Sequence, residues 1–442
     1  MSAPAPAIIV PHAETIRRRF PIEGARFHLL VFAAGFLLVF ARRPDAILNP
    51  QFFAEEGSFF YRDAYQLGLH SLVLAYGGYF HSLLRVVALL AQLVPLAWAP
   101  LLMTLAAITV QLLPVNVFLS SRFSRISFPV RVFAGLVYLA LPNSYEIHAN
   151  ATNFQSHQAL LTCLLLLAQP AQNKFWKWFD AITMVLTSVS SPAGLFLLPV
   201  AALMWWYQGE IWSAACFGFL LPGTAIQSIS VLLHWHGRQA AHLGFSGSPV
   251  LNGGTLGVNF HYFAGIFGRQ IFFSSLLGLN SQSWLLRSHW LLLIEMASCA
   301  VGFGFLLYAL RSAPIELKLF ILFEYAVLAL ELLNPLAGPP DRPQWFWLNI
   351  PGCGNRYYFA PMLAFLAAVL FVAIQKKSPR ALRCCAALLL ALLPIGVCRD
   401  FRYPPFVDLK FRVFAQRFQN AAPGTKVIIP INPNWLMELT KH

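Results

Sequence analysis

Long, nearly uninterrupted apolar runs constrain this 442-residue chain more than any other feature of its sequence. Residues 159–167, 359–374 and 386–397 are three examples. Only 11% of the residues are charged, against about 25% in a typical soluble domain. Because such runs are stable in lipid rather than in water, the sequence predicts an all-α polytopic membrane protein.

The apolar segments define the expected organisation of the chain. A helix needs about 20 apolar residues to cross a bilayer, and fewer when it is packed inside a bundle. About eleven transmembrane helices are therefore expected, at residues 25–41, 98–119, 129–145, 154–170, 178–191, 193–207, 211–233, 288–310, 315–334, 357–375 and 382–398. Residues 1–24 are a cytoplasmic segment, residues 25–398 the membrane domain, and residues 399–442 a small extracytoplasmic C-terminal tail with a β-like run at residues 426–433.

The distribution of cations predicts the orientation. The chain carries 31 Lys and Arg against 17 Asp and Glu, a net charge of +14. The cations cluster in short loops such as residues 122–131 and 376–383, which the positive-inside rule places in the cytoplasm. No nucleic-acid partner is expected, because that would need a basic face on a soluble domain. We expect an integral protein of the bacterial inner membrane whose polar outer loops face the periplasm.

The first outer loop, residues 42–97, requires a choice. Its segment 79–94 is apolar enough to cross, but crossing would place Arg122 and Arg125 outside. The loop is therefore expected to contain helices that lie in the membrane interface.

Acidic side chains are concentrated in the same loop. Glu55, Glu56 and Asp63 lie within nine residues. Acids at the start of a helix can simply stabilise the helix dipole. They can also act as a general base or bind a metal, and adjacent carboxylates raise one another's pKa when poorly solvated.

Two resemblances start from this acidic pair. The string Glu55-Glu56-Gly57-Ser58-Phe59-Phe60, followed by an interfacial helix at residues 78–85, resembles the GT-C class of polyprenyl-phosphate-sugar-dependent glycosyltransferases. The chain is also similar to bacterial membrane proteins with a Glu-Asp-Gly-type loop, an Asn/Gln/His-rich outer loop and an Arg-Tyr-Tyr element. Aligning Asp-Glu of the first group favours Glu55 as the catalytic base, whereas the second favours Glu56.

The GT-C resemblance implies a GT-C-like fold and an inverting transfer from a polyprenyl-phosphate sugar to an acceptor hydroxyl on the periplasmic face. The acceptor is a glycan, a lipid or a protein, and membrane lipids are further partners. Arg356 and Tyr357 would then bind the donor phosphate. A divalent cation, Mg²⁺ or Mn²⁺, is left open, and no other cofactor is expected.

A second polar cluster lies in residues 143–157. Its side chains can bind sugar hydroxyls, although a solvated turn between two spans would have a similar composition. The candidate substrate-binding residues are Glu146, His148, Asn150, Asn153, Gln155 and His157, together with Asp63 and His81 of the first outer loop.

Arg356 follows at the start of a span. Its planar fork can bind two phosphate oxygens, but an arginine followed by tyrosines can also be an interfacial anchor. Residues 234–259 are expected to be a mobile loop or lid.

The alternative function is a transporter or flippase of lipid-linked saccharides. It would use ionisable residues within the membrane, for which Glu295, Glu324 and Glu331 are candidates. No internal repeat is visible, and repeats are common in transporters. The glycosyltransferase is therefore the preferred hypothesis.

Overall fold

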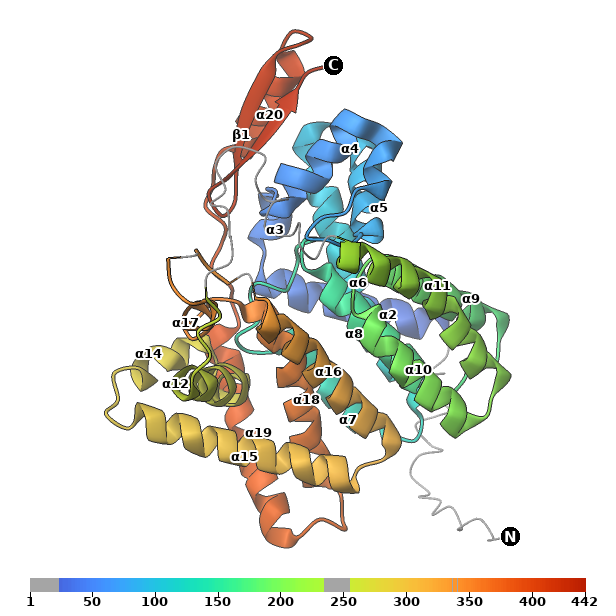
Figure 1. The fold of residues 1–442 in the computed structure, drawn as a ribbon, viewed down its shortest axis with the longest axis vertical. Helices are drawn as coiled ribbons and strands as arrows, with labels where there is room; N and C mark the ends of the chain where they lie inside the picture. The colour runs from blue at the N-terminus through green and yellow to red at the C-terminus, as the bar shows by residue number, and fades with distance from the viewer. Residues whose placement is uncertain (1–23, 234–254, 336, 340) are drawn as a thin grey trace.

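The structure is a computed structural model that describes residues 24–233, 255–335, 337–339 and 341–442. It is a bundle of helices, with a small two-stranded sheet at one end (Figure 1). The expected lid lies largely outside the described residues.

Six helices of the described chain are long and apolar enough to cross a membrane. They are α2 (Ala25–Arg42), α6 (Ala99–Leu119), α11 (Ile211–Leu233), α15 (Leu291–Ser312), α18 (Asn355–Ile374) and α19 (Arg380–Asp400). The prediction of a helical membrane protein is confirmed.

The other five expected spans also coincide with helices: α7 (Phe128–Ala140), α8 (Phe154–Leu167), α9 (Lys174–Ser188), α10 (Gly194–Gln208) and α16 (Ile315–Leu333). Of these, α7, α8 and α10 are apolar but shorter than a full span. Helix α16 has sufficient length, but it carries several charged residues, including Glu324 and Glu331. The count of eleven spans therefore stays a prediction.

Helix α18 is at the centre of the largest core. Its buried residues Tyr358, Met362, Phe365, Val369 and Val372 recur every three or four positions and so line one face. The helix packs against α15, α16 and α19. This packing fixes the positions of the residues at both ends of α18.

One buried helical segment was not expected. Helix α12 (Phe260–Ala264), the π-helix η6 (Gly265–Phe273) and α13 (Ser274–Leu277) lie in a region interpreted from the sequence as an outer loop. Gly268 allows close packing, because an added Cβ would lie 2.1 Å from the carbonyl oxygen of Glu295. Arg269 is buried and forms an ion pair with Glu295 at 2.8 Å. The segment was not recognised as helical from the sequence because it contains a charged residue and glycines.

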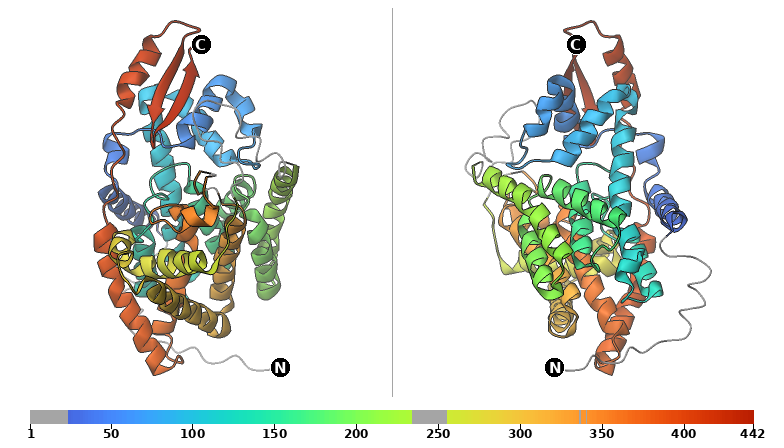
Figure 2. Two further views of the ribbon diagram at one scale, coloured as in Figure 1. Left: turned by 60° about the vertical axis from the view of Figure 1, so that its left-hand side comes forward. Right: turned by 90° about the vertical axis from the view of Figure 1, so that its right-hand side faces the viewer.

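The first outer loop and the tail form the end of the molecule that we call the Glu55 end. The loop contains η1 (Glu56–Tyr61), α4 (Arg62–Leu67), η2 (Gly68–Val73) and α5 (Ser82–Leu90). The tail forms α20 (Phe411–Asn420) and an antiparallel hairpin of β1 (Lys426–Ile431) and β2 (Trp435–Thr440). The strand predicted in the tail is confirmed, and the hairpin lies beside the outer-loop helices in the views of Figure 2.

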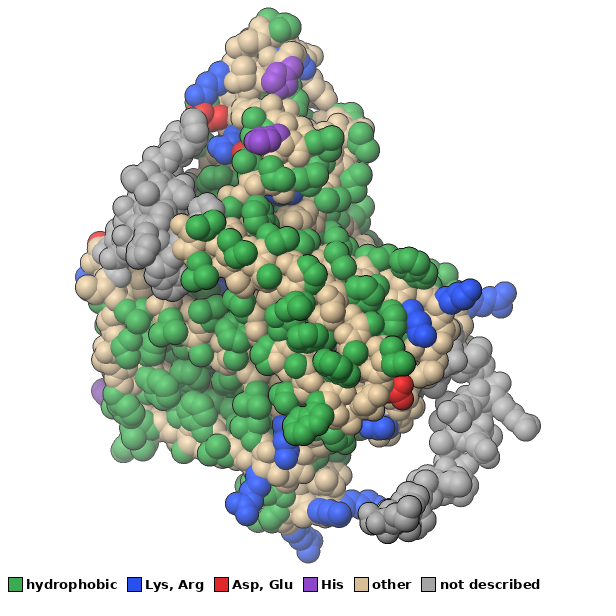
Figure 3. Space-filling view, turned by 45° about the vertical axis from the view of Figure 1, so that its right-hand side comes forward, with side chains coloured by type: hydrophobic (Ala, Val, Ile, Leu, Met, Phe, Trp, Pro, Cys, Tyr) green, Lys and Arg blue, Asp and Glu red, His purple; other side chains and the backbone are tan. Residues whose placement is uncertain are grey.

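Side-chain types are distributed unevenly over the surface. Figure 3 shows hydrophobic side chains over the middle of one face, whereas Lys and Arg gather toward the end opposite the tail. Large apolar side chains are also exposed on α15 and α19, where they include Leu293, Leu307 and Leu388. A hydrophobic belt with cations beyond it is the arrangement expected of a membrane protein.

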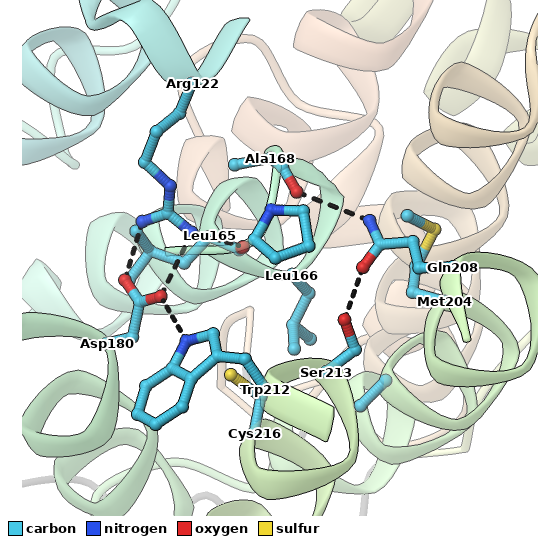
Figure 4. Close-up of a pocket in the computed structure, with 12 residues that line it drawn as sticks. Arg122, Leu165, Leu166, Ala168, Asp180, Met204, Gln208, Trp212, Ser213 and Cys216 are labelled. Carbon is cyan, nitrogen blue, oxygen red and sulfur yellow. Dashed lines mark hydrogen bonds and ion pairs between the residues drawn. The ribbon is translucent and has the colours of Figure 1, made fainter. Parts of the chain in front are cut away.

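A buried ion pair away from the Glu55 end joins the segment after α6 to α9 (Figure 4). Arg122, which follows α6, contacts Asp180 of α9 at 2.7 and 3.0 Å, and the Trp212 indole donates to Asp180 at 3.1 Å. The adjoining cavity measures only ≈ 10 Å³, about the space of one water molecule. We interpret this pair as a packing contact.

Candidate functional site

The backbone before Glu55 is held by the C-terminal tail. Ala54 has a φ of 46°, a conformation that residues with a Cβ seldom adopt. Its N–H donates to the carbonyl of Asn432 at 2.6 Å, and the Asn432 N–H donates to the carbonyl of Phe52 at 3.2 Å. The Asn432 side chain in turn donates to and accepts from the backbone of Val407 at 3.1 Å. The tail therefore fixes the local geometry from which the Glu55 side chain projects.

Glu56 is a buried connector between two loops. It is 1% exposed, and its carboxylate accepts from the N–H of Phe53 at 3.0 Å and from the N–H of Ala151. Burial raises the pKa of Glu56 to about 7, although these backbone donors act in the opposite direction. Both oxygens of Glu56 are thus engaged in joining residues 52–56 to residues 141–153.

Glu55 is half-buried and faces a different environment. The Tyr76 hydroxyl donates to Glu55 Oε1 at a long 3.5 Å. Burial raises the pKa of Glu55, and nearby Glu146 raises it further, whereas Arg356 lowers it. Glu55 therefore lies near enough to a cation and a second carboxylate, both from distant parts of the chain, for their charges to act on it.

Arg356 occupies the first turn of α18 and is held by Glu146. Glu146 accepts from the Arg356 backbone N–H at 3.2 Å and also forms an ion pair with its guanidinium. The guanidinium also donates to the Tyr357 hydroxyl at 3.2 Å and lies 4.8 Å from the Tyr357 ring centroid. The Arg356 side chain remains 35% exposed, so a ligand can reach it.

Tyr79 joins a third group of residues to the site. Its hydroxyl accepts from Gln155 Nε2 at 3.3 Å, while Gln155 Oε1 is buried without a partner among the described residues. Burial raises the pKa of Tyr79 to about 12, and the nearby groups Glu331, Tyr357 and Glu55 contribute to the increase. Tyr79 therefore lies among groups from the first outer loop, α16 and α18.

The polar cluster at the Glu55 end, which we call the Glu55 cluster, thus consists of Glu55, Tyr76, Tyr79, Glu146, Gln155, Glu331, Arg356 and Tyr357. Of the candidate residues, the structure brings together Glu55, Glu146, Gln155, Arg356 and Tyr357. Tyr76 and Tyr79 were not predicted, because no sequence motif marks them. Glu331 was predicted only as part of a transporter, although a carboxylate in an apolar helix is a signal for a functional site.

Four candidates in residues 143–157 lie behind this cluster and shape the loop. Asn150 and Asn153 donate to the backbone carbonyl of Glu146 at 2.6 and 3.0 Å. His148 and His157 are buried and stack on one another with 5.4 Å between ring centroids. Burial places the pKa of His148 well below its ordinary value, so this histidine is neutral. In the structure Asn150 and Asn153 hold the backbone of Glu146, and the two histidines pack inside the same loop.

Asp63 and His81 lie behind the Tyr76 turn. Asp63 forms ion pairs with Arg62 at 2.9 Å and Arg85 at 3.3 Å. His81 is buried, lies 3.3 Å from the Tyr76 carbonyl oxygen and has its pKa lowered to about 3 by burial. Both residues stabilise the segment that presents Tyr76 and Tyr79.

In the part of the chain that the structure describes, no group of three or more His, Cys, Asp or Glu side chains is arranged to hold a metal ion. Arg356 is the cation that the described chain itself places beside Glu55 and Glu146. A divalent cation, Mg²⁺ or Mn²⁺, stays a prediction, and Arg356 is the phosphate-binding group that the chain itself supplies.

Comparisons with known proteins give little beyond the geometry. No family model and no curated protein matches the chain. Among solved structures, the chain is similar to the archaeal oligosaccharyltransferase AglB from Archaeoglobus fulgidus, a complex with an inhibitory peptide and a dolichol-phosphate, at 12% sequence identity and a TM-score of 0.35. The match covers 89% of this chain and 58% of the archaeal chain. The function proposed for the chain therefore depends on the residues of the Glu55 cluster.

Proposed function

We propose that the chain is an inverting membrane glycosyltransferase that moves a sugar from a polyprenyl-phosphate donor to an acceptor hydroxyl on the periplasmic face. The observation that carries the proposal is the position of Glu55, a half-buried carboxylate in the same polar cluster as the accessible Arg356, at one end of a bundle of apolar helices. A general base and a phosphate-binding cation are the two groups that this reaction requires.

Glu55 is assigned as the base, and Glu56 as the residue that positions it. The carboxylate of Glu56 accepts from the backbone of Phe53 and of Ala151 on its two oxygens, whereas Glu55 accepts a long hydrogen bond from Tyr76 and is influenced by its own backbone. The less engaged carboxylate is better able to accept a proton from a substrate. The raised pKa of Glu55 also suits this role, because a base works best when its pKa is near the operating pH.

Arg356 is assigned to the donor phosphate. Arg356 lies in the first turn of α18, where a lipid-linked phosphate at the membrane surface can approach its guanidinium. Glu146 holds the side chain in the absence of donor, and the five N–H donors of arginine allow it to bind phosphate oxygens as well. Tyr357 restricts the guanidinium from the other side.

The proposed step conserves atoms and charge. Glu55 removes the proton of the acceptor hydroxyl while the oxygen attacks the anomeric carbon of the donor. The bond from this carbon to the phosphate oxygen breaks, and the electron pair leaves with the polyprenyl phosphate, whose charge Arg356 stabilises. Attack from the face opposite the leaving group inverts the anomeric centre.

Gln155 and Tyr79 are proposed to contact the transferred sugar. The buried Oε1 of Gln155 has no partner among the described residues, and an unsatisfied buried acceptor is costly. A sugar hydroxyl would supply the missing donor. Glu331, which lies close to both Tyr79 and Arg356, can accept a further hydroxyl.

A transporter of lipid-linked saccharides remains the second candidate because of α16. Glu324 and Glu331 are two helical turns apart on this helix, and Glu324 is 3% exposed. Buried carboxylates in series along a membrane helix are typical of proton pathways. A transporter would use Glu324, whereas the glycosyltransferase reaction does not require it.

The test is transfer by the purified protein in lipid, with a panel of polyprenyl-phosphate sugars as donors. Wild type, Glu55→Gln, Arg356→Gln and Glu324→Gln are compared at equal folded concentration. Transfer that is lost in Glu55→Gln and retained in Glu324→Gln supports the enzyme. Failure of every donor to react, together with donor movement across vesicles that needs Glu324, would replace the enzyme with the transporter.

A further inference from the structure

A second polar feature lies at the opposite end of α18. The turn between α18 and α19 borders a pocket of ≈ 430 Å³. The residues lining it include Lys376, Ser378, Arg380 and Arg383. Its volume is sufficient for a charged headgroup rather than a single water molecule.

Two buried polar atoms at the pocket have no partner within the described residues. Ser378 is 5% exposed, and its Oγ makes no hydrogen bond there. The same is true of Nε of Arg383, which can only donate. Buried donors are nearly always satisfied in proteins, so these atoms indicate a ligand with acceptor oxygens.

The charges around the pocket are also uncompensated. Lys376, Arg380 and Arg383 form no ion pair with any carboxylate that the structure describes. Another basic region at this end differs, because Arg125 pairs with Glu316 at 3.3 Å. Cations required only for membrane orientation would not need a shared, partly buried pocket.

The backbone adds a further favourable element. Helix α19 begins at this pocket, and its N-cap residue, Pro379, provides no side-chain cap. The free N–H groups of a first helical turn attract anions. Side-chain donors and the first turn of α19 therefore border the same pocket.

The location indicates the source of the anion. Helix α18 has 20 residues, so its two ends are about 30 Å apart, close to the thickness of the hydrocarbon layer. The pocket thus lies at the membrane boundary opposite Arg356. Ile374 and Leu388 beside it are 48% and 68% exposed, which gives acyl chains an apolar surface to lie against.

We propose that this pocket binds a phosphate group, carried by the headgroup of an anionic phospholipid in the leaflet opposite the Glu55 cluster. Ser378, Arg383 and the first turn of α19 bind the phosphate oxygens, and Lys376 and Arg380 provide the surrounding charge. The site is independent of the proposed glycosyl transfer.

The test measures lipid retained by the full chain. Purified protein, exchanged from phosphatidylcholine vesicles with and without phosphatidylglycerol, is analysed by native mass spectrometry and by titration with phosphatidylglycerol. Ser378→Ala and Arg383→Gln should each weaken binding roughly tenfold, because each removes a hydrogen bond to a charged group. Lys377→Gln is the matched control, since this exposed neighbour does not line the pocket, and it should change binding by less than about twofold.

Two further results decide the assignment. Competition by inorganic phosphate as effective as that by phosphatidylglycerol would overturn the lipid source, whereas failure of inorganic phosphate to compete supports it. Equal weakening by Lys377→Gln and Arg383→Gln would show that only the general field of positive charge matters, and would overturn the site. Ser378→Ala removes a single oxygen atom, so a folded, thermally stable variant keeps the test valid if Arg383→Gln unfolds.

Discussion

Glu146 binds Arg356 twice, once through the backbone N–H that begins α18 and once through the guanidinium. The two residues are separated by 210 positions, and this contact holds the arginine within the Glu55 cluster. We expect Glu146→Gln to lower kcat by about tenfold while the KM for the donor does not rise. Glutamine can still accept from the Arg356 N–H, but it no longer orients the guanidinium. A raised KM with unchanged kcat would contradict a positioning role.

The two neighbouring glutamates should respond differently to the same substitution. Glu55→Gln removes the proposed base and should lower kcat by about 10² to 10⁴ at unchanged stability. Glu56→Gln leaves one backbone N–H without an acceptor and should mainly destabilise the fold, by about 1–3 kcal/mol. Activity per folded molecule and thermal unfolding separate the two effects. Loss of activity in folded Glu56→Gln beside an active Glu55→Gln would exchange their roles.

The pH dependence of activity should reflect Glu55. Burial raises its pKa above the ordinary 4.5, and a base must be ionised before it can accept a proton. We therefore expect kcat/KM to fall as the pH decreases through this raised pKa. Tyr76→Phe removes a hydrogen bond that stabilises the charged form of Glu55. In this variant the fall in kcat/KM should therefore occur at a higher pH. An unchanged pH dependence in this variant would argue against Glu55 as the titrating group.

The free energy of unfolding should depend on pH in the opposite direction, because of Glu56. Its pKa is about 7 in the folded protein and 4.5 ordinarily, so folding favours the protonated form. Its contribution is complete below pH 4.5 and is lost as the pH rises through about 7, a change on the order of 3 kcal/mol. The difference in melting temperature between wild type and Glu56→Gln, followed across this range, measures it. A constant difference would exclude this titration.

The tail should be required for a rapid reaction. Asn432→Ala removes two hydrogen bonds to Val407, which hold in place the tail residue whose backbone is bonded to Phe52 and Ala54. We expect kcat to fall about tenfold with little change in KM, because the Glu55 backbone loses its support. Asn420→Ala, at the exposed end of α20, is the control and should be neutral. Equal effects of the two variants on kcat would show that the tail does not support catalysis.

Much of the fold was predictable because hydrophobicity alone specifies membrane helices. All eleven expected spans coincide with helices, and the strand in the tail was recognised from its β-branched residues. The helical segment around Arg269 was not predicted, because its charge is compensated by Glu295 in a later helix. A local sequence cannot reveal such a distant partner.

The site was predictable in part for the same reason. Glu55 and Arg356 were identified by residue type and by their position at the ends of apolar segments. The distinction between Glu55 and Glu56 was not available, because it depends on the N–H of Ala151 from another loop. Residues such as His148 have the composition of a binding site, but the fold uses them as buried supports.

The bridge between Phe53 and Asn432 also has a consequence for biogenesis. The two residues are far apart in the sequence, and every candidate membrane helix of the described chain except α2 lies between them. The loop that carries Glu55 can therefore be closed only after all these helices have been synthesised and inserted. During translation the nascent chain would contain the Glu55 carboxylate without its supporting backbone contacts, and the proposed activity would appear only at the final step of assembly.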